Sequence, residues 1–191
     1  MRRFTNQRQP DTSSEIWLLH HPPVFTLGPA GKPEHILHPG GIPVVRSDRG
    51  GQVTYHGPGQ LIVYLLINLQ DAGMGVRGLV SCMEDAVIEL LANHGVSACS
   101  RSDAPGVYAG DAKIAALGLR VRRGLTYHGL ALNMDMNLAP YDRINPCGYA
   151  GQKITQTRSL GLKLDMQQAA TELVPLLAAK LNHFPIWTSN D

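Results

Sequence analysis

The chain has 191 residues, 43% of them apolar, which is enough for one domain with a substantial buried core. Its 17 Lys and Arg nearly balance 15 Asp and Glu, and the formal charge of +2 argues against a nucleic-acid-binding protein. The longest apolar run, LIVYLL, is far shorter than the roughly 20 residues of a membrane-spanning helix. The N-terminus lacks the apolar segment of a secretory signal, and three cysteines without regular spacing do not suggest disulfides, so a cytoplasmic protein without membrane partners is expected.

The first part of the chain predicts short strands separated by loops rich in proline and glycine. Residues 15–28 are rich in branched and aromatic side chains and are broken by Pro22-Pro23, which predicts a strand, a bend and a second extended piece. A loop is expected over 29–43, followed by two short extended segments around the glycines of VVRSDRGGQVTYHGPGQ. The run LIVYLLINL, residues 61–69, predicts a strand that is buried on both faces.

The second part predicts two helices around a group of strands. Apolar residues recur at intervals of three and four over 76–94, and Gly95 supplies a C-terminal stop for this helix. Residues 96–136 read as four strands, VSACS, GVYAG, AKIAALGLRVRR and YHGLALNMDM, in a meander or mixed sheet. Asp165 is a plausible N-cap for a last helix through MQQAATELVPLLAAKL, which Pro175 is expected to bend. Strand runs with segregated helices predict an α+β fold.

The segment INPCGYAG places Cys147 between a proline and a glycine, where the backbone must bend. Cys82 falls in the helical pattern and Cys99 in a short apolar run. A free cysteine is usually a small buried apolar group, which is the alternative interpretation of Cys147. A nucleophilic cysteine needs a group that lowers its pKa or accepts its proton, and no such group stands within this segment.

Lys113 is one candidate for that group. In a strand with strict alternation it shares a face with four apolar residues, while Arg120 and Arg122 lie on the other face. The four apolar residues are Ala115, Leu117, Leu119 and Val121. The alternative is that the lysine stem lies along the sheet and the amine reaches water at the strand end. Burial lowers the pKa of a lysine and makes it a usable proton acceptor.

His56 and His128 are rival bases, since a Cys-His pair is the commoner arrangement for cysteine nucleophiles. Each precedes a glycine. A lone histidine is usually structural, so a catalytic role for either one requires that the fold place it near the cysteine. Four further histidines lack companion cysteine or acidic ligands at zinc spacing, so no metal site is predicted from them. They are His20, His21, His35 and His38.

Two further segments leave open interpretations. RGGQVTYHGPGQ, residues 49–60, holds four glycines and a proline, so its backbone either approaches a ligand closely or forms a tight hairpin without one. It is neither a Walker A motif nor a dinucleotide-binding motif. Arg120, Arg122 and Arg123 form either a solvated face or a docking site for an acidic protein.

Four motifs, RGGQVTYHGPGQ, DAPGVYAGDAKIAALGLRVRRG, HGLALNM and RINPCGYAG, together resemble the octanoyl (lipoyl) transferase family from about Glu15 to Gln152. The resemblance implies a fold similar to lipoate and biotin protein ligases, with Cys147 as the acyl-accepting nucleophile and Lys113 as its partner. It also implies an acyl pocket lined by three segments. Their residues are Arg49, Gly50, Gly51, Gln52, Val53, Thr54, Tyr55, His56, Ala116, Leu117, Gly118, Gly129, Leu130 and Ala131.

The same resemblance implies the partners and the cofactor requirement. The donor is octanoyl-acyl carrier protein, and the acceptors are lipoyl domains of 2-oxoacid dehydrogenase E2 subunits and the glycine cleavage H protein. Neither ATP nor a metal is expected. The family begins with an additional strand and most of a helix before the equivalent of Met1, so residues 1–191 are expected to form a single catalytic domain without them.

Three other functions stay open on the residues alone. They are a thioester hydrolase in which His128 or His56 activates the cysteine, an ATP-dependent lipoate ligase, and a non-enzymatic module that binds a carrier protein.

Overall fold

The computed structural model describes residues 1–146 and 151–181. It contains a six-stranded sheet in the order β1-β5-β9-β8-β7-β6 and a three-stranded sheet in the order β3-β2-β4. The strands are β1 (Glu15–Leu19), β2 (Val24–Leu27), β3 (Val44–Arg46), β4 (Val53–His56), β5 (Gln60–Leu66), β6 (Cys99–Ser100), β7 (Val107–Ala109), β8 (Ala112–Arg122) and β9 (Leu125–Asn133). The helices are α1 (Arg2–Gln7), α2 (Val76–Asn93) and α3 (Met166–Lys180), with short 3-10 turns η1 (Pro33–His35), η2 (Ala139–Arg143) and η4 (Arg158–Leu160). This arrangement confirms the α+β prediction.

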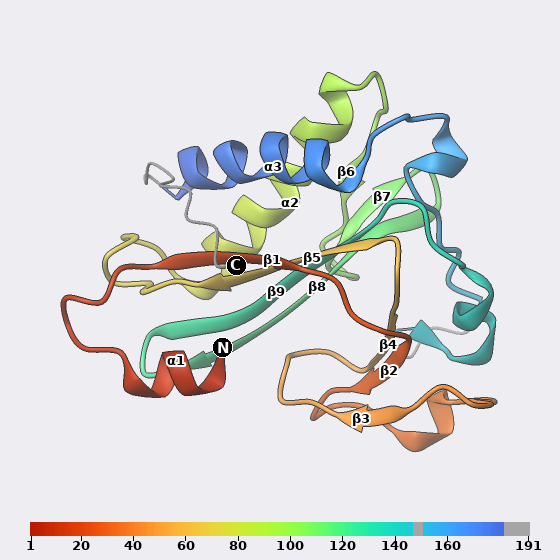
Figure 1. Cartoon of the computed structure of the whole chain (residues 1–191), viewed down its shortest axis with the longest axis horizontal. Helices are drawn as coiled ribbons and strands as arrows, with labels where there is room; N and C mark the ends of the chain where they lie inside the picture. Colours follow the sequence, from red (N-terminus) through yellow and green to blue (C-terminus); the bar gives the residue numbers. More distant parts are fainter. Residues whose placement is uncertain (147–150, 182–191) are drawn as a thin grey trace.

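The large sheet separates two environments. Figure 1 shows α2 and α3 on one face, with α1 and the small sheet on the other. Along β5, Leu61, Val63 and Leu65 belong to the large core under the helices, whereas Ile62 and Tyr64 lie on the opposite face. Side chains of a strand point alternately to the two faces, so this run is apolar throughout because both faces are covered. The prediction of a strand buried on both sides is confirmed.

Both predicted helices form, with the expected signals at their ends. α2 stops where Gly95 adopts a φ of 76° and donates its N–H to the carbonyl of Ala92. α3 begins with a capping box in which Asp165 accepts from the Gln168 N–H and the Gln168 side chain accepts from the Asp165 N–H. Pro175 lies inside α3 without ending it. No helix in the described ranges combines the length and the apolar character that crossing a bilayer requires.

The small sheet has its own core, and its topology rules out one of the two interpretations of the glycine segment. β2 lies between β3 and β4, parallel to the first and antiparallel to the second. The segment between β3 and β4 therefore crosses over β2, and the tight hairpin is not formed. The second core packs seven buried side chains at this end of the molecule: Phe25, Leu27, Val53, Tyr55, Met136, Tyr141 and Ile144.

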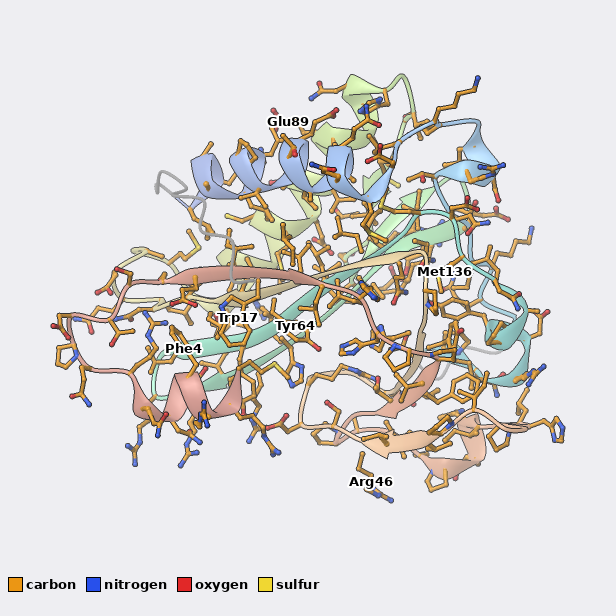
Figure 2. The ribbon with its side chains drawn as sticks, viewed as in Figure 1. Phe4, Trp17, Arg46, Tyr64, Glu89 and Met136 are labelled. Carbon is orange, nitrogen blue, oxygen red and sulfur yellow. The ribbon has the colours of Figure 1, made fainter. Side chains whose placement is uncertain are left out.

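The N-terminal helix α1 was not expected from the sequence, because the residues before Glu15 are polar and show no apolar periodicity. Its apolar anchor is Phe4, whose ring meets the ring of Trp17 edge-on at 5.6 Å, and its polar contacts join Arg2 to Asp48 and Asn6 to Arg122. Figure 2 shows these two side chains together below β1. A single apolar anchor on a six-residue helix is too little to produce a readable pattern.

The predicted face of Lys113 is wrong, because the pairing of β7 with β8 is irregular. Tyr108 pairs with Lys113, but the preceding Val107 pairs with Ala115, so Ile114 is an extra residue in β8. Ile114 and Ala115 both belong to the core under the helices, as does Val107, whereas Tyr108 does not. Directly paired residues share a face, so Lys113 lies with Tyr108 and not with the apolar face of Ala115.

Candidate active site

A cavity of about 410 Å³ lies between the two sheets, on the face of the large sheet opposite α2 and α3. This volume falls within the usual range of small-molecule pockets. Twelve of the residues expected at an acyl pocket line it: Arg49, Gly51, Gln52, Val53, Thr54, His56, Ala116, Leu117, Gly118, Gly129, Leu130 and Ala131. Gly50 and Tyr55 lie outside this lining. Gly50 donates its N–H to the carbonyl of Leu119, and Tyr55 packs in the small core between Phe25 and Tyr141.

The glycine loop forms one wall of the cavity and is fixed by a buried arginine. The Arg49 guanidinium donates to the carbonyl of Thr26 at 2.6 Å, to its hydroxyl at 2.8 Å and to the Gln52 carbonyl at 2.8 Å. A side chain at Gly28 would meet the Gly51 carbonyl at 2.2 Å, so the loop packs directly on the backbone of this neighbouring segment. These bonds hold the wall in place before any ligand enters.

One end of the cavity holds a carboxylate network around Asp48. Asp48 accepts from the Tyr127 hydroxyl at 2.6 Å and from His128 Nε2 at 2.9 Å, and Arg2 lies 3.2 Å away. Burial alone would raise the pKa of Asp48, but these hydrogen bonds and the Arg2 charge lower it to about 2. Burial lowers the pKa of His128 more than the carboxylate raises it. His128 is thus a neutral donor to Asp48, and its Nε2 is occupied.

His56 also lines the cavity and belongs to a buried amide network. Its Nδ1 lies 2.8 Å from Gln60 Oε1, while Gln60 Nε2 donates to Asn133 Oδ1 at 2.9 Å. The Gln60 oxygen is then the acceptor, which places the His56 proton on Nδ1. Burial lowers the pKa of His56 to about 4, although its bond to Gln60 opposes the shift. Each histidine thus donates through one ring nitrogen and can accept a proton at the other, His56 at Nε2 and His128 at Nδ1, so both remain rival bases.

Lys113 is almost fully buried, with 3% of its surface exposed. Its Nζ donates to the Pro105 carbonyl at 3.1 Å and lies 5.2 Å from the centre of the Tyr108 ring. The alternative in which the amine reaches water at the strand end is therefore wrong. Lys113 stands three residues before Ala116, where β8 begins to line the cavity, a separation of about 10 Å along a strand.

Cys147 lies outside the described residues, but the residues on both sides of its segment are fixed. Asn145 donates its N–H to the His35 carbonyl at 2.8 Å. On the other side, Lys113 donates its N–H to the Lys153 carbonyl at 2.8 Å and accepts from the Thr155 N–H at 2.9 Å. The chain that carries Cys147 thus returns directly to the backbone of Lys113.

The other cysteines and histidines assemble no comparable site. Cys82 donates its thiol to the Lys180 carbonyl at 3.5 Å, and burial raises its pKa, while Cys99 is exposed on β6. Across residues 1–146 and 151–181, no group of three His, Cys, Asp or Glu side chains is placed to hold a metal ion. His21 is instead bound to the Tyr64 hydroxyl at 2.7 Å.

Two residues near these groups were missed from the sequence. Asp48 stands in a loop with no local partner, so only the fold brings it to Tyr127 and His128. Glu84 had a readable signal: it lies four residues after Val80 and three before Val87, on the apolar stripe of its helix. A single acidic residue on such a stripe indicates a buried carboxylate with a specific partner.

Residues 1–177 match the family described as "Lipoyl protein ligase A/B catalytic domain". An octanoyltransferase of Pseudomonas putida (strain W619) is 60% identical over 183 residues, which cover 96% of this chain and 85% of that protein.

Two solved structures show the same fold at low sequence identity. Lipoate-protein ligase A bound with ATP superimposes with a TM-score of 0.82 at 16% identity, covering 100% of this chain and 82% of the other. A biotin protein ligase from Aquifex aeolicus superimposes with a TM-score of 0.54 at 15% identity, covering 65% of this chain and 53% of the other. The expected likeness to both ligase folds is confirmed.

Proposed function

Because this chain belongs to the lipoyl protein ligase A/B catalytic domain family and is an octanoyltransferase within it, we propose that it transfers octanoyl through a thioester on Cys147, with Lys113 as proton acceptor. The donor is octanoyl-acyl carrier protein. The acceptor is a lipoyl domain, either of a 2-oxoacid dehydrogenase E2 subunit or of the glycine cleavage H protein. The reaction serves protein lipoylation and lipoate biosynthesis.

The first step exchanges one thioester for another. Lys113 Nζ takes the proton of the Cys147 thiol, and the thiolate sulfur forms a bond to the carbonyl carbon of the donor. The carbon–sulfur bond to the carrier then breaks, and the departing thiolate takes the proton back from Nζ. Since a thioester replaces a thioester, this exchange needs no ATP and no metal.

The second step forms the amide. The neutral amine of the acceptor lysine attacks the acyl-enzyme carbonyl, a carbon–nitrogen bond forms, and the carbon–sulfur bond to Cys147 breaks. Lys113 takes the surplus proton of the amine and passes it to the Cys147 thiolate, which restores the enzyme. A lysine suits both steps because, unlike arginine, it can release its proton.

One observation supports the pair above all others: Lys113 is buried, and its backbone is bonded on both sides to the segment that follows Cys147. A lysine nitrogen taken out of water next to a thiol can exchange a proton with it without competition from solvent. The cavity beyond Ala116 supplies an apolar space for the octanoyl chain, with an apolar lining from Ile62, Ala116 and Ala131.

The test is to incubate the enzyme with octanoyl-acyl carrier protein and no acceptor. One octanoyl group is expected on the protein, removable by hydroxylamine and mapped to Cys147 by peptide mass spectrometry. Cys147→Ala should abolish the adduct, while Cys82→Ala and Cys99→Ala should keep it. Lys113→Ala should slow its formation by about 100-fold or more and shift the pH profile upward, because the thiol must then ionise without an acceptor.

Other outcomes would favour the competing functions. Free octanoate released without an acceptor would indicate a hydrolase, and a requirement for ATP would indicate a ligase. Full function in Cys147→Ser would indicate a binding module. Acyl transfer at the normal rate by Lys113→Ala, with loss of activity in His56→Gln, would move the base to His56.

A further inference from the structure

A buried acidic residue reaches the proposed base from the helix side of the sheet. Glu84 lies on α2 among apolar neighbours and is 8% exposed. Its Oε1 accepts the N–H of Gly106 at 2.9 Å. A carboxylate held in such surroundings costs free energy unless it is hydrogen-bonded, so this bond fixes the Gly106 N–H as well as Glu84 itself.

The same peptide group also holds Lys113. The bond between Pro105 and Gly106 presents its N–H to Glu84 and its carbonyl oxygen to Lys113 Nζ, at 3.1 Å. The peptide bond is trans, so its N–H and its carbonyl point in opposite directions. Glu84 and Lys113 therefore lie on opposite sides of one peptide and are linked through it.

The rest of this loop is built around that link. Gly106 has a φ of 141°, and a side chain there would lie 3.0 Å from Lys113 Cε and 2.8 Å from the Ala115 carbonyl. The hydroxyl of Tyr108, whose ring faces Lys113 Nζ, donates to the Ala104 carbonyl at 2.8 Å. The loop before β7 is thus tied to the lysine through the Pro105 carbonyl, and to the ring that faces the lysine through the Ala104 carbonyl.

We propose that Glu84 is a positioning residue for octanoyl transfer, which acts by fixing the Pro105–Gly106 peptide so that its carbonyl holds the Lys113 amine where Cys147 needs it. This inference rests on the proposed function of Lys113. Hydrogen bonds in series polarise one another, so the Glu84 charge also strengthens the Pro105 carbonyl as an acceptor for the lysine. This link helps to fix the position from which the flexible lysine side chain takes the thiol proton.

The charges around Glu84 agree with this arrangement. Burial raises the pKa of Glu84, whereas the Gly106 N–H and the positive charge of Lys113 act to lower it, and the neighbouring Asp85 raises it. The loop and the lysine thus oppose the effect of burial, while the link itself needs only an oxygen that accepts the Gly106 N–H.

The experiment compares two substitutions of Glu84, one that keeps an oxygen acceptor for the Gly106 N–H and one that removes it. Glu84→Gln keeps an oxygen that accepts the Gly106 N–H, while Glu84→Leu keeps the bulk and removes the acceptor. We expect the single-turnover rate of octanoyl transfer to the enzyme to fall about tenfold or more in Glu84→Leu. In Glu84→Gln it should stay within about threefold of the natural enzyme. The KM for the octanoyl donor should change little in either, because Glu84 does not line the cavity.

Glu89→Leu is the matched control for helix stability. Glu89 lies on the same helix and pairs with Lys180 of α3 at 2.7 Å, on the side of the sheet away from Tyr64 (Figure 2). The Glu89→Leu substitution should lower the melting temperature without slowing acylation. All rates are measured well below the melting temperatures, and Glu84→Asp, which withdraws the carboxylate by one methylene, replaces Glu84→Leu if that variant does not fold.

A double-mutant cycle with Lys113→Ala separates positioning from a general structural effect. If Glu84 acts through Lys113, Glu84→Leu should slow the enzyme no further once Lys113 is absent. An equal loss in both backgrounds, a normal rate in Glu84→Leu, or a Glu84→Gln variant as slow as Glu84→Leu would overturn the inference. A normal rate in Lys113→Ala would instead overturn the proposed role of Lys113, so the two failures are distinguishable.

Discussion

The two ends of the β8–β9 hairpin differ in how far their charged side chains are exposed to solvent. At the end near Lys113, a cation is buried against a peptide carbonyl, and a carboxylate lies on the far side of that peptide. At the turn end, Arg120 and Arg122 are exposed to solvent beside Asp48, a carboxylate bound by a tyrosine, a histidine and an arginine. Both ends contain charges of both signs, but only the first keeps its amine out of water.

One structural element thus carries a buried group suited to proton transfer at one end and exposed charges suited to recognition of a partner at the other. A buried amine can exchange protons with a neighbour undisturbed by solvent, whereas exposed cations act at a distance on an approaching partner. The cavity lined by Ala116 and Gly118 lies between the two ends. Disturbing the buried end should therefore change the rate of the chemical step, and disturbing the exposed end should change stability or association.

The largest expected effect comes from Gly106→Ala at the buried end. Its left-handed φ and the contacts of the added methyl with Lys113 Cε and the Ala115 carbonyl should lower the free energy of unfolding by about 1–3 kcal/mol. The acylation rate should fall about tenfold or more, because the methyl displaces the lysine. Urea denaturation and single-turnover labelling measure the two quantities.

Gly110→Ala is the matched control for that substitution. Gly110 also has a left-handed φ, of 59°, but its added methyl would meet open space at the turn between β7 and β8. The Gly110→Ala variant should be less stable than the natural enzyme but should be acylated at the normal rate. Equal slowing in both variants would mean that backbone strain, and not contact with the lysine, sets the rate.

A smaller effect is expected from Asp48→Asn at the other end. The folded pKa of Asp48, about 2, lies below the ordinary value near 3.9, so its carboxylate stabilises the folded protein above pH 4 and loses that contribution as the pH falls through 2. Asp48→Asn should be less stable by about 1 kcal/mol at pH 7, and the difference should shrink toward pH 2. Urea titrations across this range, with exposed Asp11→Asn to correct for the lost charge, measure it. A difference independent of pH would contradict the assignment.

The smallest effect concerns the exposed cations. Arg120 and Arg122 line a polar hollow with Tyr127, and Arg123 stands in the adjoining turn with a φ of 52°. Reversing the three charges should slow association with an acidic carrier protein or lipoyl domain by up to about tenfold at low salt and flatten its salt dependence. Lys163→Glu, in the loop before α3, is the control. An unchanged salt dependence for both partners would leave these arginines as a solvated surface.

Much of the fold could be predicted because it depends on local signals. The α2 helix, its stop at Gly95, the Asp165 cap and the doubly buried β5 each follow from spacing or from a single residue type. The face of Lys113 could not be predicted, because a bulge depends on pairing with another strand and leaves no mark in the strand's own sequence. The Asp48 network likewise joins residues 80 positions apart, and no sequence feature near Asp48 indicates that His128 is its partner.

Because β8 holds one extra residue, the face on which Lys113 lies depends on the number of residues in the two paired strands, β7 and β8. Deleting Ile114 would remove the bulge and restore regular pairing of β7 with β8, and Lys113 would then stand directly before Ala115. Neighbouring residues of a strand point to opposite faces, so the lysine would stay with Tyr108 and away from the core under α2 and α3. One residue inserted between Val107 and Tyr108 would instead pair with Ile114 and give β8 strict alternation, which turns Lys113 to the core face of Ala115. A gain of one codon in β7 would thus remove the proposed base as completely as replacing Lys113 itself, even though both residues of the proposed Cys147–Lys113 pair would still be encoded.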